Sequence, residues 1–385
     1  MLRMIPAPGV FLAGISAFLI VAWDAFEAII LPRRVTRKFR ITRFYFLITW
    51  TSWKFYARLI PERKSRETFL GFYGPISLLF LIAVWAIGLV LSFGMMQFGA
   101  GSAVNVSGSN PSIYTDLYLS GTTFFTLGLG DVIPRSSFAR FLVVAEAGFG
   151  FGFLAAVIGY IPFIYGAFGR RETNIALLDA RAGTPPTAGE LLRRHSYTTG
   201  NVALRDLLKE WERWCAELLE SHLSYPVLAY FRSQHDNQSW IGSLTAILDT
   251  CALTIAGIEE SCAKQAELTF AIARHAVVDL CQVFSTPPRP LNTDRLPPET
   301  LEKLRFKLAQ HGTVLLTSPQ ANEKLLELRR MYEPYVYALA IHLNQALPPW
   351  IPAKKGKDNW QTTAWAQSTG VIDKEPISLA HDDHF

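Results

Sequence analysis

The segment TTFFTLGLGDVIP, Thr122–Pro134, lies between two long apolar segments and holds two glycines separated by one residue. Inside a membrane, non-helical backbone is tolerated only where protein buries it or water bathes it. Glycine reaches positive φ without a steric penalty from Cβ. A strip with alternating glycines can therefore turn successive carbonyl oxygens toward one side, and such a ladder can replace the hydration shell of a monovalent cation.

The composition indicates a membrane protein with a second, soluble part. Of the 385 residues, 50% are hydrophobic and only 18% are charged, with a mean hydropathy of +0.19. Soluble domains usually carry about 25% charged residues. The apolar residues concentrate in residues 9–170, and residues 171–385 have the composition of a soluble protein. We therefore expect a membrane half followed by a cytosolic half.

Three apolar runs are long enough to span a bilayer, which takes about 20 residues. They cover residues 9–31, 73–98 and 138–168. A cleaved signal peptide is a poor alternative for the first run, because the strong positive charge follows that run instead of preceding it. Charged side chains interrupt residues 41–60. That segment is expected to form an amphipathic helix on the cytoplasmic interface.

Positive charge is concentrated after the first apolar run. The chain has a net charge of +5 and a pI of about 9.0, and basic residues gather from Arg33 to Arg66. Because this cluster lies between apolar spans, we expect it to contact anionic lipid headgroups and not nucleic acid. By the positive-inside rule, the N-terminus lies outside and the C-terminal domain lies in the cytoplasm.

Residues 70–168 resemble the pore module of the potassium channel family, in its two-transmembrane type. The filter of that family usually reads T-x-G-[YF]-G-D. The positions of the filter are taken here by Thr126, Leu127, Gly128, Leu129 and Gly130. The resemblance implies that their backbone carbonyls, with the hydroxyl of Thr126, coordinate K⁺ as the permeant ion.

The resemblance extends to both sides of this strip. Asp131 falls on the acid behind the outer mouth, and residues 114–125 take the position of the pore helix. The C-terminal dipole of that helix would favour a cation in the cavity. The chain has one pore loop and a closed ring needs four, so a homotetramer is expected.

The sequence departs from the family pattern around the filter. Leu129 stands where the family usually has Tyr or Phe, and Leu119 stands where some members have a tryptophan partner. An apolar cuff is therefore expected around the filter. Thr122 stands where some members have a glutamate that pairs with the filter aspartate. Asp131 must then have another partner.

The last apolar run carries the candidate gate. Gly150 lies sixteen residues after Pro134 and matches the hinge glycine of the family, while Pro162 removes a helix hydrogen bond. We expect a bending point at Gly150 and a constriction near Pro162. The alternative for Gly150 is that it lets helices pack closely.

Three carboxylates lie at membrane depth, where such groups usually face protein or water. Glu146 is expected to hydrogen-bond behind the pore helix, with pH sensing as the alternative. Asp24 and Glu27 share a helix face near the basic cluster, and charge pairing with that cluster is expected.

The expected fold is an all-α membrane protein: a tetrameric pore of outer helix, pore helix, filter and inner helix, with an α-helical cytosolic domain. The expected segments are an N-terminal transmembrane helix (residues 1–32) and a basic cytoplasmic segment with an interfacial helix (33–69). They are followed by the pore domain (70–170), the helical cytosolic domain (171–347) and a flexible polar tail (348–385).

The predicted function is potassium-selective conduction with gating modulated by the cytosolic domain. The alternatives are a weakly selective monovalent cation channel, because of Leu129, and a non-conducting membrane scaffold or receptor. No nucleophile, base or metal constellation indicates an enzyme, and no cofactor is expected. The resemblance suggests a bacterial inner membrane, and an unknown ligand of the cytosolic domain stays possible.

Overall fold

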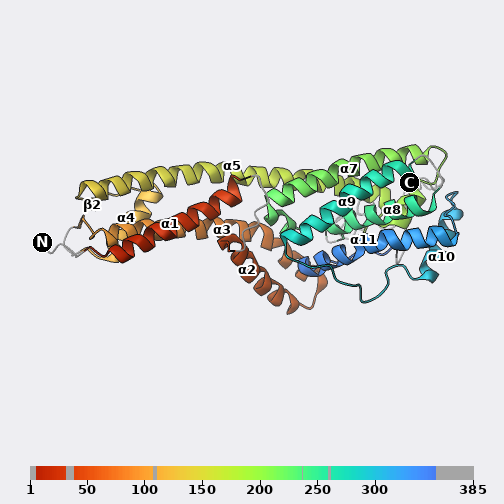
Figure 1. The fold of residues 1–385 in the computed structure, drawn as a ribbon, viewed down its shortest axis with the longest axis horizontal. Helices are drawn as coiled ribbons and strands as arrows, with labels where there is room; N and C mark the ends of the chain where they lie inside the picture. Colours follow the sequence, from red (N-terminus) through yellow and green to blue (C-terminus); the bar gives the residue numbers. More distant parts are fainter. Residues whose placement is uncertain (1–5, 32–38, 107–110, 236, 259–261, 353–385) are drawn as a thin grey trace, which may run out of the picture. The chain divides into compact units, whose positions relative to one another are not determined.

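The structure is a computed structural model that describes residues 6–31, 39–106, 111–235, 237–258 and 262–352, and it is mostly helical (Figure 1). The chain divides into two compact units. The first comprises residues 1–59 and 72–166, and the second comprises residues 60–71 and 167–385.

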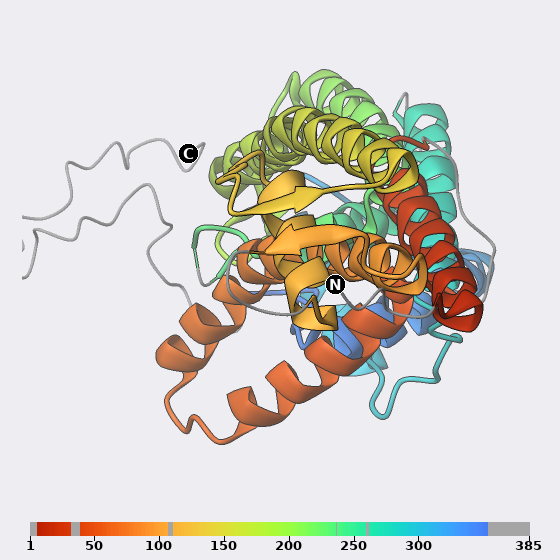
Figure 2. The ribbon, with the colours of Figure 1, turned by 90° about the vertical axis from the view of Figure 1, so that its left-hand side faces the viewer.

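The first unit holds five helices or parts of helices and one pair of strands among its described residues. The elements are α1 (Pro8–Ile29), α2 (Ile41–Arg58), α3 (Arg63–Gly99), β1 (Val104–Val106), α4 (Ile113–Phe124), β2 (Val132–Pro134) and α5 (Ser137–Ala182). The strands β1 and β2 pair antiparallel, with Val104 opposite Pro134 and Val106 opposite Val132. Figure 2 shows the two strands side by side.

Helices α1 and α3 pack closely because glycines lie at their contacts. A Cβ added to Gly99 would lie 2.4 Å from the backbone nitrogen of Phe11, and one added to Gly14 would lie 2.9 Å from Met96. Small residues allow such an approach of two helix backbones in a membrane. A residue later in α1 contacts a residue earlier in α3, so α1 and α3 are antiparallel.

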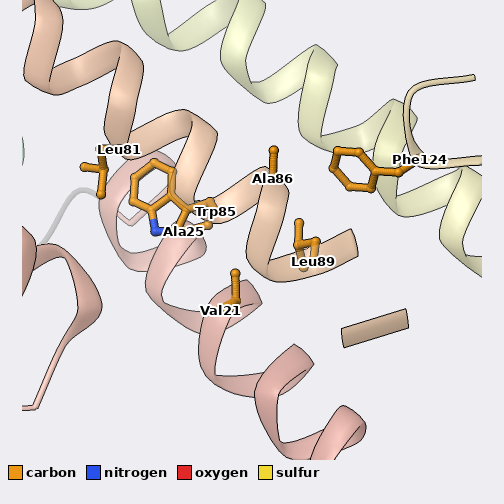
Figure 3. Close-up of a cluster of buried hydrophobic side chains, with 7 residues drawn as sticks. All are labelled: Val21, Ala25, Leu81, Trp85, Ala86, Leu89 and Phe124. Atoms are coloured by element: carbon orange, nitrogen blue, oxygen red, sulfur yellow. The ribbon is translucent and has the colours of Figure 1, made fainter. Parts of the chain in front are cut away.

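A buried apolar cluster joins these two helices to the end of α4 (Figure 3). Trp85 of α3 is fully buried, and Phe124 is the last residue of α4. The cluster comprises Val21, Ala25, Leu81, Trp85, Ala86, Leu89 and Phe124. The N-terminal helix is thus part of the core that supports α4.

The two carboxylates near the end of α1 have different partners. Glu27 forms an ion pair with Arg40 at 3.3 Å, which confirms the expected pairing with the basic segment. Asp24 instead accepts hydrogen bonds from the Thr42 hydroxyl at 2.6 Å and from the Trp85 indole at 2.9 Å. Neutral donors of α2 and α3 thus reach Asp24, while residues 32–38 of the basic cluster lie outside the described residues, so charge pairing of Asp24 stays a prediction.

The expected helix of residues 41–60 is α2, and it packs by one face. The Tyr45 hydroxyl donates to the Ser77 carbonyl at 2.8 Å, and the hydroxyls of Thr49 and Tyr73 lie 2.9 Å apart. Apolar side chains stay exposed elsewhere on the helix, namely Phe44, Leu47, Ile48, Phe55 and Tyr56.

The second unit is a helical bundle. Its own elements are α6 (Ala188–Arg194), α7 (Gly200–Ser224), the 3₁₀ helix η1 (Pro226–Tyr230), α8 (Trp240–Gly257), α9 (Ala263–Val283), α10 (Pro298–Ala309) and α11 (Pro319–Leu343). Helix α9 packs against α7, α8 and α11, and α8 also contacts α11 and α6 (Figure 1). The four cysteines are buried thiols in this unit.

Four helices of the described residues are long and apolar enough to cross a membrane: α1, α3, α5 and α8. Helix α1 covers the first predicted span up to Ile29, and α3 and α5 contain the other two predicted spans and extend beyond them. In α8, 94% of the apolar stretch is buried inside the structure. A helix that is apolar all round is typical of a protein core as well as of a membrane. We therefore interpret α8 as the central helix of the bundle.

An ion network closes this bundle and includes residues that the sequence assigned to a tail. Arg295 pairs with Asp249 at 2.6 Å and with Glu333 at 3.1 Å, and it also donates to the Pro348 carbonyl at 2.8 Å. Trp350 is fully buried, with the guanidinium of Arg295 5.6 Å from its ring centroid. Packing thus continues past residue 347, because Trp350 anchors the chain, and residues 353–385 lie outside the described residues.

Candidate ion pathway

The pore-helix position of the sequence is occupied by α4. The side chain of Thr115 accepts a hydrogen bond from the Ser112 backbone nitrogen at 3.3 Å, which satisfies a donor at the start of the helix. Asp116 lies in the first turn, where a carboxylate is favoured by the helix dipole. It is fully buried and accepts a hydrogen bond from the Ser102 hydroxyl.

The glycine strip begins where α4 ends. The Thr122 carbonyl accepts the backbone N–H groups of Leu127 at 2.7 Å and Gly128 at 3.2 Å. These bonds fold the first residues of the strip back onto the last turn of α4. The position of the strip therefore depends on the position of α4.

The backbone of the strip alternates in handedness. Thr126, Gly128 and Gly130 have φ values of 56°, 55° and 80°, while Leu127 and Leu129 between them are not in the positive-φ region. Positive φ is uncommon for a residue with a side chain, so Thr126 is held there against its preference. The glycines adopt it without that penalty. This alternation matches what a row of carbonyls facing one side requires.

The strip is exposed in the single chain. Every residue from Phe125 to Asp131 is exposed, and Leu127 and Leu129 are more than 60% exposed. No other atom lies within 4 Å of a Cβ added to Gly128 or Gly130. The described part of this chain therefore does not itself form the apolar cuff expected around Leu129. Leu119, in contrast, is packed with Val104 and Val132 in a buried cluster.

Asp131 lies close to α4. Its carboxylate interacts electrostatically with the Tyr118 hydroxyl of that helix. Directly after Asp131 the chain enters β2, and the Arg135 backbone nitrogen donates to the Ala103 carbonyl at 2.7 Å. Asp131 thus lies beside α4 and is followed by the strand pair.

Gly150 lies against the end of α4. A Cβ at this position would come within 2.3 Å of the Phe124 carbonyl oxygen and 3.1 Å of the Phe124 Cα. These are backbone atoms and cannot turn away as a side chain can. The contact favours the close-packing interpretation of Gly150, because only glycine fits this approach.

Pro162 lies within α5, which the structure describes as one helix from Ser137 to Ala182. By contrast with Gly150, no described atom of this chain beyond the neighbouring helix backbone lies within 4 Å of a Cβ added to Gly148, Gly152 or Gly159. Apolar side chains are exposed along the same stretch of α5, among them Phe141, Val144, Phe151, Leu154 and Ile158.

Glu146 hydrogen-bonds to α4 as the sequence predicted. Its Oε1 contacts the Ser120 hydroxyl, and both residues are fully buried. The Ser120 Oγ also lies 2.7 Å from the Val90 carbonyl of α3. Glu146, Ser120 and Val90 thus link the three helices of the pore module.

The first residues of α3 and the last residues of α5 belong to the second unit, and one short segment of that unit binds both. The Arg171 guanidinium, on α5, donates to the Leu228 carbonyl at 2.9 Å and the Phe231 carbonyl at 2.6 Å. Arg232 forms an ion pair with Glu67 of α3. We call residues Pro226–Arg232 the junction segment.

Sequence reasoning missed Tyr118, Ser120 and the junction segment as partners. A signal existed for Ser120, because a hydroxyl on an apolar helix between two apolar spans requires a polar neighbour. For the junction segment no local signal exists, since its partners lie far away in the chain. The tail sequence HDDHF lies outside the described residues.

Comparison with known families agrees with this geometry. Residues 77–162 match a family described as "Ion channel", and this match includes most of α3, all of α4, the glycine strip and α5 up to Pro162. Comparisons with curated proteins and with solved structures gave no match. The matched family consists of channels, not enzymes, and its members typically assemble as oligomers. Residues 77–162 are therefore an ion channel domain, carried by an integral membrane protein.

Proposed function

We propose that this protein is a potassium-selective channel whose filter is Thr126–Gly130. The observation that carries the proposal is the alternating handedness of Thr126, Gly128 and Gly130 in a strip that begins at the end of α4. In the proposal, the five backbone carbonyls and the Thr126 hydroxyl replace the hydration shell of K⁺. Asp131 lies at the outer mouth, close to Tyr118.

The proposed assembly is a homotetramer. Irregular backbone at membrane depth must be covered by protein or line water, and the strip from Phe125 to Asp131 is exposed in one chain. Three further copies would cover the side chains of Leu127 and Leu129 and leave their carbonyls facing the axis. The apolar cuff around Leu129 would then come from a neighbouring subunit.

The test of conduction is ion flux into liposomes that hold the purified protein, first with a K⁺ gradient and then with a Na⁺ gradient. Gly128→Ser should abolish flux, because a side chain at φ 55° is strained and disturbs the carbonyl ladder. Gly152→Ser is the matched control, since Gly152 lies in α5 with open space around its Cα. Equal loss of ion flux in Gly128→Ser and Gly152→Ser would contradict the assignment of the filter.

A weakly selective cation channel is the second candidate. The observation that favours it is Leu129, which has no hydroxyl to hydrogen-bond within a cuff. Equal K⁺ and Na⁺ flux through the wild type, abolished in Gly128→Ser, would establish this candidate. No flux of either ion through wild-type protein that assembles as a tetramer would favour a scaffold or receptor.

Gating by the cytosolic domain is proposed from the junction segment. Arg171 follows Pro162 on the same helix, and it is fixed to the carbonyls of Leu228 and Phe231. A rearrangement of the bundle would thus move the end of α5. Pro162 is the proposed constriction on that helix, and a bending point at Gly150 is the alternative to its packing role.

Arg171→Gln tests this connection, with Arg170→Gln as a matched control. Arg170 is the exposed neighbour on the same helix, whereas Arg171 is buried. We expect single-channel open probability to change in Arg171→Gln and to stay at the wild-type value in Arg170→Gln. Unchanged gating in both variants would contradict the connection.

The proposed orientation places the N-terminus outside and the helical domain in the cytoplasm, in a bacterial inner membrane. The basic residues after α1 and the exposed apolar side chains of α2 support contact of residues 33–66 with anionic lipid. We keep the division into residues 1–32, 33–69 and 70–170 as a proposal, with the helical domain extended from 171 to 352.

A further inference from the structure

Three helices meet at the hydroxyl of Ser120. Ser120 lies in α4, Val90 in α3 and Glu146 in α5. The Ser120 Oγ is 2.7 Å from the Val90 carbonyl and also contacts Glu146 Oε1. The side chains of Ser120 and Glu146 are both fully buried, so no bulk water intervenes.

The number of protons available to Ser120, Val90 and Glu146 determines whether Glu146 is ionised or neutral. A serine hydroxyl has one proton, a backbone carbonyl can only accept, and an ionised carboxylate can only accept. If Ser120 gave its proton to an ionised Glu146, its oxygen would face the Val90 carbonyl oxygen at 2.7 Å with no hydrogen between them. Both contacts are satisfied when Ser120 donates to Val90 and Glu146 donates to Ser120.

Among the described residues of this chain, none around Glu146 supplies a cation to hold a carboxylate. Helix α3 has no charged side chain from Thr68 to Gly99. On α4, Asp116 is bonded to Ser102, and Tyr118 is a neutral group close to Asp131. On α5, the nearest basic residue toward the outer end is Arg140, which donates to the Pro134 carbonyl at 3.4 Å.

On α1, Asp24 and Glu27 are engaged by Thr42 and Arg40. The second oxygen of Glu146, Oε2, is buried and has no hydrogen-bond partner in the described chain. Burial strongly disfavours an ionised carboxylate in this state, whereas a neutral acid leaves only a weak acceptor unpaired.

We propose that Glu146 is a neutral carboxylic acid that donates its proton to Ser120 and thereby positions the pore helix for the filter. The path to the filter is short. Ser120 lies two residues before Thr122, and the Thr122 carbonyl accepts the N–H groups of Leu127 and Gly128. Holding Ser120 between α3 and α5 therefore holds the start of the carbonyl ladder. Glu146 is a positioning residue, since it does not touch the proposed ion path.

Infrared spectroscopy of the full-length protein in lipid at neutral pH tests the protonation directly. We expect a carbonyl band of a protonated carboxylic acid that is absent in Glu146→Gln. In Ser120→Ala the band should shift, because its hydrogen-bond acceptor is removed. A wild-type spectrum in which Glu146→Gln removes only carboxylate bands would overturn the proposal. This measurement does not depend on conduction.

The positioning role rests on the proposed channel function and is tested by selectivity. Glu146→Gln keeps a donor at the same reach, so we expect K⁺ preference over Na⁺ to be retained. Glu146→Asp keeps the acid but shortens the side chain by one methylene, so we expect that preference to be lost. All variants are first checked for tetramer elution in mild detergent.

Equal loss of selectivity in Glu146→Gln and Glu146→Asp would overturn the role of Glu146 as a neutral donor, as would full retention in Glu146→Asp. Absence of flux in the wild type would instead contradict the proposed function, and the infrared spectra would still decide the state of Glu146. The two failures are thus distinguishable.

Discussion

Arg232 forms an ion pair with Glu67, which lies 165 residues earlier in the chain. The same guanidinium donates to the carbonyls of Leu343 and Asn344, both at 2.9 Å. Glu67 is in the first turns of α3, and Arg232 ends the junction segment, whose carbonyls also bind Arg171 of α5. One short segment of the helical domain therefore holds the continuations of both the outer and the inner helix.

Removing the charge of Arg232 should loosen this junction. We expect Arg232→Gln to lower the free energy of unfolding of the helical domain by about 1–3 kcal/mol. The side chains of Arg232 and Glu67 are only 12% and 21% exposed, so the loss exceeds that of a surface pair. Thermal unfolding monitored by tryptophan fluorescence would measure it.

The matched control is Arg205→Gln. Arg205 pairs with Asp206 at 3.6 Å, but these side chains are 50% and 64% exposed. Exposed pairs contribute about 0–1 kcal/mol. Equal melting temperatures of Arg232→Gln and Arg205→Gln would contradict a stabilising junction.

Glu190 should make the helical domain sensitive to strong acid. Burial acts to raise its pKa, but hydrogen bonds from Arg193 and Arg194 outweigh burial and lower the pKa to about 2. A carboxyl with a depressed folded pKa stabilises the fold above its unfolded pKa, and that contribution is lost as the pH falls toward the folded value. The stabilising effect should therefore disappear between about pH 4.5 and pH 2.

The measurement is the difference in melting temperature between wild type and Glu190→Gln across this pH range. We expect a difference at neutral pH that shrinks to nothing near pH 2. Glu302→Gln is the control, because Glu302 pairs with Arg305 but its side chain is 67% exposed. A difference for Glu190→Gln that stays constant with pH would show that the charge of Glu190 is not involved.

His222 should destabilise the domain on mild acidification. Burial first, and the neighbouring Arg171 second, lower its pKa well below 6.5. The unfolded chain therefore binds a proton that the folded chain excludes, so stability falls as the pH drops below about 6.5. His222→Gln should remove this dependence, as measured by urea unfolding at pH 7.5 and pH 5.5. If the wild type and His222→Gln lost the same stability between pH 7.5 and pH 5.5, another group would cause the pH dependence.

The sequence predicted the membrane part well because its determinants are local. Span positions follow from the length of apolar runs, and a glycine strip followed by an acid between two spans is a specific pattern. The predicted contact of Glu146 with the pore helix was confirmed for the same reason, since a carboxyl at that depth must find a protein partner.

What the sequence could not predict depends on contacts between distant residues. Asp24 accepts from Trp85, 61 residues away, although basic residues are closer in the sequence. Trp350 is buried beside Arg295 although polar residues and prolines surround it in the sequence. The high hydropathy of α8 is compatible with a membrane span and with a protein core. Only the packing of α9 and α11 against α8 indicates the protein core.

A substitution at Gly150 distinguishes a role of this residue in helix packing from a role as a hinge. In Gly150→Ala the new methyl group would meet the Phe124 carbonyl oxygen, and overpacking of this kind costs about 1–3 kcal/mol. Phe124 lies two residues before Thr126, so relief of the clash would displace the start of the strip. We expect lower thermal stability of the detergent-solubilised assembly together with weaker K⁺ selectivity.

Gly152→Ala is the matched control on the same helix. Beyond the neighbouring helix backbone, a Cβ at Gly152 meets no described atom of this chain within 4 Å, so stability and selectivity should stay at wild-type values. If Gly150 served only as a hinge, Gly150→Ala would change open probability and leave both stability and selectivity unchanged. That outcome would contradict the packing role, because alanine is accepted in a helix without strain only where its methyl group has space.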